Sequence, residues 1–270
     1  MPKNRLRKHL ETCALVYGCP AAKNFFIGRY EAPLPTSRHC NARCLGCISK
    51  QENSGIRCSQ ERIIFTPKPE EIAQVALEHI NKVEKAIVSF GQGCEGEPLL
   101  AFNAIEPGIK LIRSKTSKGT INLNTNASMP ELIKKLFSSG LDSIRVSMNS
   151  VQKKYYNAYF RPVSYCFEDV LKSIEIAKEM DKFVSINYLN CPGFTDTLEE
   201  EAALIKFISK FNIDLIQWRN LNYDPLKYYK AMFASEIYPT KGVKNLLFNI
   251  KKSFPKLRYG YFNPYLKKNS

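Results

Sequence analysis

The sequence has no run of eighteen consecutive apolar residues, which excludes a conventional membrane-spanning helix. It also has no signal-peptide core, because the apolar stretch at residues 14–17 that follows the basic N-terminus is too short. Disorder is excluded by composition: 44% of the residues are hydrophobic and 11% aromatic, enough for a sizeable core. We therefore expect a globular, cytoplasmic protein that makes no contact with a membrane.

Acidic residues are scarce. The 270 residues include 25 Asp and Glu against 40 Lys and Arg, a net charge of +15. From Leu226 to Ser270 basic and aromatic residues interleave, and Glu236 is the only acid. Such a mixture suits a groove for single-stranded nucleic acid. The alternative, which we favour, is a solvated lysine-rich surface over an aromatic core, since charge alone identifies no substrate.

The cysteine pattern argues against a disulfide scaffold. Nine cysteines are an odd number, and they are too sparse for a small disulfide-bonded domain. Without an export signal, metal binding or catalysis is the better interpretation. Cys13 and Cys19 could ligate a second metal centre, although two buried structural cysteines are the simpler explanation.

Three cysteines stand close together in the segment Cys40-Asn41-Ala42-Arg43-Cys44-Leu45-Gly46-Cys47. A loop can bring thiols at this spacing to one point, and soft thiolate sulfur favours zinc, copper(I) or iron–sulfur clusters. A structural zinc site is normally closed by four protein ligands. Three thiolates on a four-iron cluster would instead leave one iron open. The segment therefore predicts a metal centre with an exchangeable position.

A second motif, Gly96-Glu97-Pro98, follows an apolar strand pattern at residues 85–90. C-x3-C-x2-C followed by a strand and a Gly-Glu-Pro turn resembles the radical S-adenosylmethionine (SAM) superfamily. The resemblance extends over roughly residues 34 to 225. It implies that Cys40, Cys44 and Cys47 hold a [4Fe–4S] cluster whose open iron binds SAM.

The resemblance also implies a reaction. One electron, from a reductant such as ferredoxin or flavodoxin, would cleave SAM to methionine and a 5′-deoxyadenosyl radical that abstracts hydrogen from a substrate. Gly96 and Glu97 would bind the methionine end of SAM, with the Glu97 carboxylate accepting hydrogen bonds from the ammonium group. Relatives place polar contacts to the ribose and carboxylate at positions that correspond here to Thr125, Asn126, Ser147 and Asn149. Arg161, before the next helix pattern, is a candidate for binding the SAM carboxylate.

Three positions depart from the family pattern. Glu95 replaces a usual glycine, Gly46 stands where an aromatic residue often packs on adenine, and Ala127 replaces the glycine of a usual Thr-Asn-Gly. We expect adenine to stack on another group, such as His39 or Tyr188. Cys94 and Cys191, near the predicted pocket, could relay a hydrogen atom or ligate a metal.

The fold is predicted from the alternation of strand and helix patterns. Strands are expected at 85–90, 120–124, 143–147, 183–188 and 215–218, with one more near the cysteines. This alternation is typical of βα units on a parallel sheet, and six units predict a partial (β/α)6 TIM-like barrel. Ligands of such sheets bind at the C-terminal strand ends. We expect an N-terminal extension (1–33), a core domain (34–225) and a basic C-terminal segment (226–270).

Two capping boxes are predicted at helix starts in this pattern. Ser128 with Glu131, and Thr197 with Glu200, have the spacing at which a hydroxyl and a carboxyl satisfy the first backbone N–H groups of a helix. Both should therefore mark a helix N-terminus.

Two classes of protein remain open. The leading hypothesis is a radical SAM enzyme whose substrate is unidentified; a nucleic acid, a phosphorylated metabolite or a glycyl-radical enzyme to be activated all remain possible. The lack of cysteines after Cys191 predicts no auxiliary-cluster domain, which argues against peptide maturation. The alternative is a non-enzymatic zinc or RNA-binding protein with a four-thiolate site. A family member without turnover is a third hypothesis, although the three cysteines and Glu97 argue against it.

Overall fold

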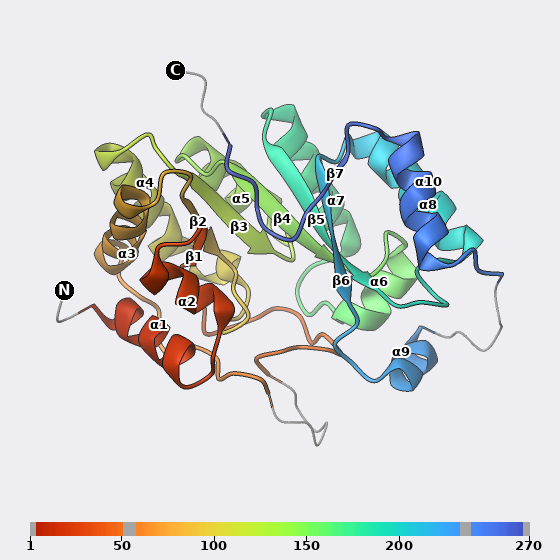
Figure 1. Ribbon diagram of the computed structural model, residues 1–270, viewed down its shortest axis with the longest axis horizontal. Coiled ribbons are helices and arrows are strands. Elements are labelled where there is room, and N and C mark those ends of the chain that lie inside the picture. The colour runs from red at the N-terminus through yellow and green to blue at the C-terminus, as the bar shows by residue number, and fades with distance from the viewer. Residues whose placement is uncertain (1–3, 51–57, 233–238, 267–270) are drawn as a thin grey trace.

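The computed structural model describes residues 4–50, 58–232 and 239–266. Its centre is a curled sheet of seven parallel strands in sequence order, an open half-barrel with helices along its outer side (Figure 1). All five strands predicted by range are present, and the predicted partial barrel is confirmed. The strands are β1 (Glu31–Pro33), β2 (Ile87–Phe90), β3 (Thr120–Thr125), β4 (Ser143–Met148), β5 (Phe183–Asn190), β6 (Leu215–Asn220) and β7 (Arg258–Tyr259).

Helices connect the strands and cover the outside of the sheet. None of those in the described part of the chain has the length and apolar character that a membrane span requires. They are α1 (Arg5–Leu15), α2 (Pro20–Ile27), α3 (Pro69–Lys82), the short 3₁₀ helix η1 (Pro98–Ala101), α4 (Phe102–Lys115), α5 (Pro130–Ser138), α6 (Lys153–Phe160), α7 (Phe167–Glu179), α8 (Leu198–Phe211), α9 (Pro225–Ala231) and α10 (Val243–Ser253).

The sheet extends beyond the range predicted for the core domain. β1 lies before residue 34 and pairs with β2, with Ala32 opposite Val88. β7 lies after residue 225 and pairs with β6, with Arg258 opposite Leu215. The basic C-terminal segment thus contributes a strand to the same sheet, and the domain boundaries themselves stay a prediction.

The two faces of the sheet differ in polarity. Side chains alternate along a strand, so Ile121 and Ile144 pack with the helices while their neighbours face the inside of the half-barrel. That inner face is polar, and its hydrogen-bonded residues are Ser89, Asn122, Asn124, Ser143, Arg145, Ser185 and Gln217.

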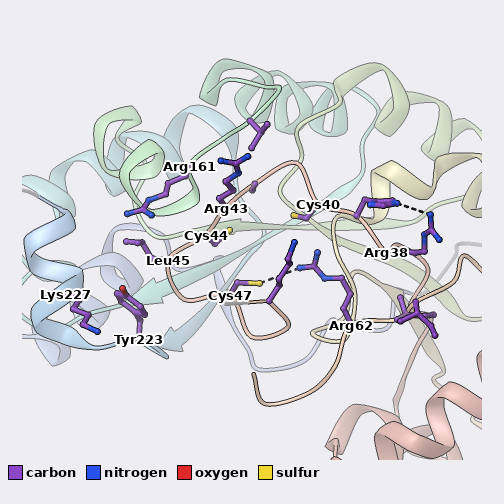
Figure 2. A pocket seen from close by; sticks show the side chains of 16 residues that line it. Arg38, Cys40, Arg43, Cys44, Leu45, Cys47, Arg62, Arg161, Tyr223 and Lys227 are labelled. Atoms are coloured by element: carbon purple, nitrogen blue, oxygen red, sulfur yellow. Dashed lines mark hydrogen bonds between the residues drawn. The ribbon is translucent and has the colours of Figure 1, made fainter. Parts of the chain in front are cut away.

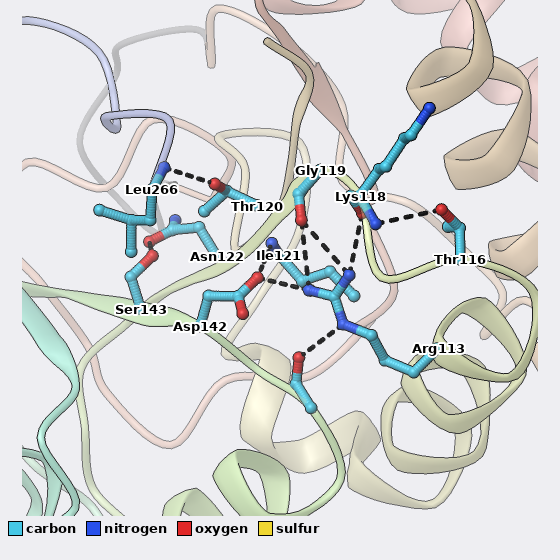
Figure 3. A network of polar contacts seen from close by, with 11 residues as sticks. Arg113, Thr116, Lys118, Gly119, Thr120, Ile121, Asn122, Asp142, Ser143 and Leu266 are labelled. Carbon is cyan, nitrogen blue, oxygen red and sulfur yellow. Dashed lines mark hydrogen bonds and ion pairs between the residues drawn. The ribbon is translucent and has the colours of Figure 1, made fainter. Parts of the chain in front are cut away.

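The C-terminal segment runs across this polar inner face. The buried Asn263 amide donates to Glu31 at 2.7 Å and to Ser89 and Asn124 at 3.3 Å. The backbone N–H of Leu266 donates to the Thr120 hydroxyl at 2.8 Å (Figure 3). Strands β1, β2 and β3 are therefore bridged on their inner side by residues from the end of the described chain.

Neither predicted capping box is complete, although both predicted helices are present: the N–H of Thr197 donates to the Phe194 carbonyl at 3.2 Å and not to the Glu200 carboxylate. The Thr197 hydroxyl caps α8 by accepting the N–H of Glu200 at 3.3 Å. At α5, by contrast, the N-cap residue is Met129, and no side chain caps the helix. The Ser128 hydroxyl is instead occupied by the Asn41 amide at 2.9 Å, because the cysteine-bearing loop packs against this turn.

A partly buried ion pair fastens α4 to the amino-terminal ends of β3 and β4 (Figure 3). The Arg113 guanidinium is paired with Asp142 and also donates to the carbonyls of Lys118 and Gly140, both at 3.0 Å. The same Asp142 carboxylate accepts the N–H of Ile121 at 2.7 Å. Asp142, just before β4, is thus hydrogen-bonded to the start of the neighbouring strand β3 as well as to α4.

Arg113→Met should destabilise the fold by about 2 kcal/mol, because it removes a charged donor from the partly buried Asp142 carboxylate and from the carbonyls of Lys118 and Gly140. Urea unfolding would measure the change. Lys110→Met is the matched control: Lys110 pairs with Glu106 on the exposed side of α4, and surface pairs contribute less than about 1 kcal/mol. Equal effects of the two substitutions would contradict the assignment.

Glu200 should make stability depend on pH. Burial raises the pKa of this carboxyl to about 7, although it accepts hydrogen bonds from Ser150, Gln152 and Tyr188. Because the folded state holds a proton that the unfolded state releases above its ordinary pKa of 4.5, stability from this group is full below that pH and is lost as pH rises through 7. The loss amounts to about 3 kcal/mol. Denaturant unfolding between pH 5 and 8 should show a flatter profile for Glu200→Gln, and an unaltered profile for the exposed Glu199→Gln; identical profiles would contradict this origin.

Candidate active site

The cysteine-bearing loop lines a cavity of about 1000 Å³ on one side of the half-barrel (Figure 2). Cys40, Cys44 and Cys47 all reach it, as the motif predicts. A cavity of this size can hold a ligand larger than a single ion. Basic residues make up much of the rest of its lining: Arg38, Arg43, Lys50, Arg62, Arg161 and Lys227.

Backbone hydrogen bonds hold the cysteine-bearing loop in place. The N–H of Arg43 donates to the carbonyl of Phe160 at 3.0 Å, and the N–H of Val163 donates to the carbonyl of Asn41 at 3.0 Å. The loop is thereby joined to the end of α6 and to the residues that follow it, more than a hundred positions away in sequence. The thiols are presented by a fixed backbone rather than by a free loop.

Burial is the main influence on the thiols of Cys40 and Cys44. Burial raises the pKa of Cys40 and, to a larger extent, that of Cys44, and the neighbouring carboxylate or thiol groups act in the same direction. Arg62 donates to the sulfur of Cys47 at 3.7 Å. A soft metal centre would compensate thiolate charge here, so this donor set fits an iron–sulfur cluster with three protein ligands.

Glu97 is buried at the N-terminus of η1. Its carboxylate accepts the N–H of Asn126 at 2.8 Å and that of Leu99 at 3.2 Å, and it is also hydrogen-bonded to the Thr125 hydroxyl. Burial raises the pKa of Glu97 to about 7, against the effect of these donors. The structure thus brings three of the predicted site residues, Glu97, Thr125 and Asn126, into one hydrogen-bonded group.

Gly96 is required by a close backbone approach. Its N–H donates to the carbonyl of Ser37 at 2.7 Å, and the next N–H, of Glu97, donates to the carbonyl of His39 at 2.8 Å. A Cβ atom on Gly96 would lie only 1.9 Å from the His39 oxygen. Gly96 and Glu97 are therefore hydrogen-bonded through their backbone to the residues that precede Cys40.

Glu95, which replaces the usual glycine of the family motif, has a clear structural role. The buried carboxylate accepts the N–H groups of Thr36 and Ser37 at 2.8 and 2.9 Å, and those of Gly91 and Gln92 at 2.7 and 2.8 Å. It joins the segment after β1 to the loop after β2. Sequence reasoning missed this role, for which the only signal was the departure from the motif.

The remaining predicted site residues are less closely gathered. Asn126 donates to Asn41 at 2.8 Å, and Arg161, in a left-handed conformation at the end of α6, lines the cavity. Ser147 is half-buried near the C-terminal end of β4. Asn149 is completely buried, and its amide donates to the Tyr155 carbonyl at 3.1 Å. The structure thus turns Asn149 toward α6. Of the residues predicted to bind SAM, Arg161 lines the cavity, and within the described part of the chain the others do not: Gly96, Glu97, Thr125, Asn126, Ser147 and Asn149.

The aromatic neighbours of the loop explain Gly46. A Cβ atom there would lie 2.8 Å from the Tyr159 hydroxyl and 3.3 Å from Tyr223, so a larger residue has no space. His39 and Tyr223 both line the cavity. Tyr188 is fully buried and donates to Glu200, so within the described residues it does not form part of the cavity lining.

Sequence reasoning also missed the polar interior of the half-barrel. Arg145, buried at the middle of β4, is hydrogen-bonded to Gln217 and contacts Ser185 at 3.5 Å. Its other terminal nitrogen has no partner among the described residues, and burial lowers its pKa to about 10. The signal was present as the alternation of polar and apolar residues along β3 and β4.

Comparison with solved structures supports the fold. The [FeFe]-hydrogenase maturase HydG aligns with a TM-score of 0.57 and 18% identity over 96% of this chain, which spans only 56% of HydG. Methylornithine synthase (PylB) aligns with a TM-score of 0.55 and 14% identity, over 97% of this chain and 79% of the synthase. A radical SAM methyltransferase from Sphaerobacter thermophilus aligns with a TM-score of 0.56 and 12% identity, over 86% of this chain and 67% of the methyltransferase. These identities establish a shared fold and no more.

No curated protein matches the chain. A family model does: the one described as the radical SAM superfamily matches residues 34–208, more than half of the sequence. This match decides against the alternative of a non-enzymatic zinc or RNA-binding protein. The chain belongs to the radical SAM superfamily, and it is accordingly an enzyme that uses a [4Fe–4S] cluster and SAM.

Proposed function

We propose that Cys40, Cys44 and Cys47 hold the [4Fe–4S] cluster and that the group around Glu97 binds SAM beside it. When bound, the cluster supplies the electron that cleaves SAM to methionine and a 5′-deoxyadenosyl radical, which takes hydrogen from the substrate. The observation that carries the proposal is the backbone hydrogen bond from the N–H of Glu97 to the carbonyl of His39, at 2.8 Å, immediately before the first cysteine. It links the two motifs directly.

The protein residues bind and orient SAM. The Glu97 carboxylate is held by Thr125 and by the N–H of Asn126, so it is oriented before any ligand arrives. In its ionised form it would accept hydrogen bonds from the SAM ammonium group. Arg161 is our candidate for the SAM carboxylate, because it is a cation on the cavity wall. Ser147, near the end of β4, is the candidate for a ribose contact.

The substrate that the cavity best suits is a small anion, such as a phosphorylated metabolite. No carboxylate is among the described residues that line the cavity, whereas six basic side chains are. Inside the half-barrel, Arg145 has a buried nitrogen with no hydrogen-bond partner among the described residues, which an anionic group could satisfy. The charge of +15 would likewise attract an acidic electron carrier such as ferredoxin or flavodoxin.

Formation of 5′-deoxyadenosine tests the reaction. The protein, reconstituted with iron and sulfide without oxygen, should convert SAM to 5′-deoxyadenosine and methionine when dithionite is added, as measured by mass spectrometry. Samples without dithionite or without iron should give none. A cluster-loaded protein that binds SAM but releases no 5′-deoxyadenosine would contradict the proposed function.

Arg145→Met tests the substrate class. A pool of phosphorylated metabolites should stimulate SAM cleavage by the wild type, while the variant should keep the unstimulated rate and lose the stimulation. Lys206→Met, on the outer helix α8, is the control and should behave as wild type. If single-stranded RNA stimulates SAM cleavage and the metabolites do not, the substrate is a nucleic acid and not a small anion.

A further inference from the structure

A second group of metal-ligating side chains lies outside the cavity. His9 and Cys13 stand four positions apart on α1, and therefore on one face of the helix. Cys94 reaches them from the loop after β2, more than eighty residues away in sequence. The ligand atoms of the three all lie within 4.8 Å of one another.

These separations are close to those of a single tetrahedral ion. Zinc–sulfur and zinc–nitrogen bonds of about 2.3 and 2.0 Å place neighbouring ligand atoms roughly 3.5 to 3.8 Å apart. The His9 Nε2 and Cys13 Sγ atoms are already 3.5 Å apart. The remaining distances need to shorten by no more than about 1 Å, which rotation of a cysteine side chain can supply.

The burial of the group also needs an explanation. Cys13 is 1% exposed and Cys94 3% exposed, and their sulfur atoms lie within 4.8 Å of each other. Together they form a small cluster separate from the main core. Two thiols and an imidazole converging in a buried place are the donor set that zinc prefers.

A fourth ligand is close at hand. After α1 the chain reverses at Gly18, which has a φ of +66°, so the N–H of Cys19 donates to the carbonyl of Cys13 at 2.9 Å. The partly exposed Cys19 side chain packs against the same cluster. Cys13, which the sequence left as either a structural residue or part of a second metal site, thus belongs to one group with His9 and Cys94, and Cys19 lies next to that group, outside the set of atoms within 4.8 Å of one another.

We propose that His9, Cys13, Cys19 and Cys94 form a structural zinc site. Cys94 stands three positions before Glu97, in the loop that Glu95 holds against the segment after β1. Zinc would therefore cross-link the N-terminal helices to the loop that carries Glu97. As in other structural sites, the metal stabilises the folded chain and takes no part in the reaction.

Metal analysis of the full-length protein tests the site. Purified without oxygen and with its iron–sulfur cluster in place, it should contain about one zinc per chain in addition to iron. His9→Asn, Cys13→Ser and Cys94→Ser should each lower the zinc content at least tenfold and leave the iron content unchanged. Cys191→Ser, a buried cysteine outside the group, is the matched control and should keep its zinc.

Cobalt(II) gives a test on the wild type, in case the buried substitutions prevent folding. After zinc is removed with a chelator, cobalt should produce thiolate charge-transfer absorption that added zinc abolishes, and Cys19→Ser should weaken zinc binding. Unchanged zinc affinity in Cys19→Ser would overturn the part assigned to Cys19. Three results would overturn the site. The protein could bind neither zinc nor cobalt, or its zinc content could be unaffected by the His9 and Cys13 substitutions. The third is a Cys13–Cys94 disulfide in protein kept from oxygen.

Discussion

Cys44→Ala should abolish the iron–sulfur cluster and reduce formation of 5′-deoxyadenosine to the background of cluster-free protein. Only three thiols of the described chain line the cavity, and two thiolates cannot replace three on a four-iron cluster. The thiol lies between Cys40 and Cys47 in the loop, and an alanine methyl group offers no ligand. The loop itself should persist, because its backbone hydrogen bonds do not involve the thiol.

Iron content, visible absorption and 5′-deoxyadenosine would be measured on the same sample. The matched control is Cys191→Ala, which removes a buried thiol just after β5; Cys191 is not among the described residues that line the cavity, so this variant should retain iron and activity. Circular dichroism would show whether Cys44→Ala keeps its secondary structure. A folded Cys44→Ala protein with full iron content would contradict the assignment of this ligand.

Gly96→Ala should keep the cluster and lose SAM affinity by about a hundredfold, equivalent to ~3 kcal/mol. The new methyl group would lie 1.9 Å from the His39 carbonyl oxygen, so the two segments must separate. Separation breaks the hydrogen bonds of Gly96 to Ser37 and of Glu97 to His39. The Glu97 carboxylate would then lose its fixed position relative to Cys40.

SAM binding would be measured by calorimetry on the cluster-loaded protein without reductant. Gly108→Ala is the control: it lies inside α4, away from the Gly96 turn, and its nearest neighbour, a methyl group of Ile72, is 3.2 Å from the added Cβ, so the packing there needs to adjust only slightly. That variant should bind SAM as the wild type does. Wild-type affinity in Gly96→Ala would show that the pairing with His39 does not position the SAM site.

The sequence predicts the parallel half-barrel because its central strands are apolar, regularly spaced and separated by helical patterns. It does not predict β7, since a pair of residues, Arg258 and Tyr259, carries no periodicity and becomes a strand only by pairing with β6. The capping box at Ser128 fails for a similar reason. Its hydroxyl is taken by Asn41, a contact between residues 87 positions apart.

For the candidate site, local motifs locate the cysteines and Glu97, and long-range packing decides the rest. Asn149 follows β4 as the family resemblance requires, yet its amide is turned toward α6 by a hydrogen bond that no spacing reveals. Arg145 could have been found from the alternation along β4. The approach of Cys94 to Cys13 could not, because it depends on how α1 packs against the sheet.

The way the cysteine-bearing loop is held has a consequence for maintenance of the enzyme. Clusters with an open iron are destroyed by oxygen, and the protein must then be reloaded. Here the loop is fixed to residues 160–163 and its entry to Gly96 and Glu97 by backbone hydrogen bonds that need no metal. We therefore expect the three proposed ligands to stay together in the apoprotein, so that repair after oxidative damage requires delivery of iron and sulfide but no refolding.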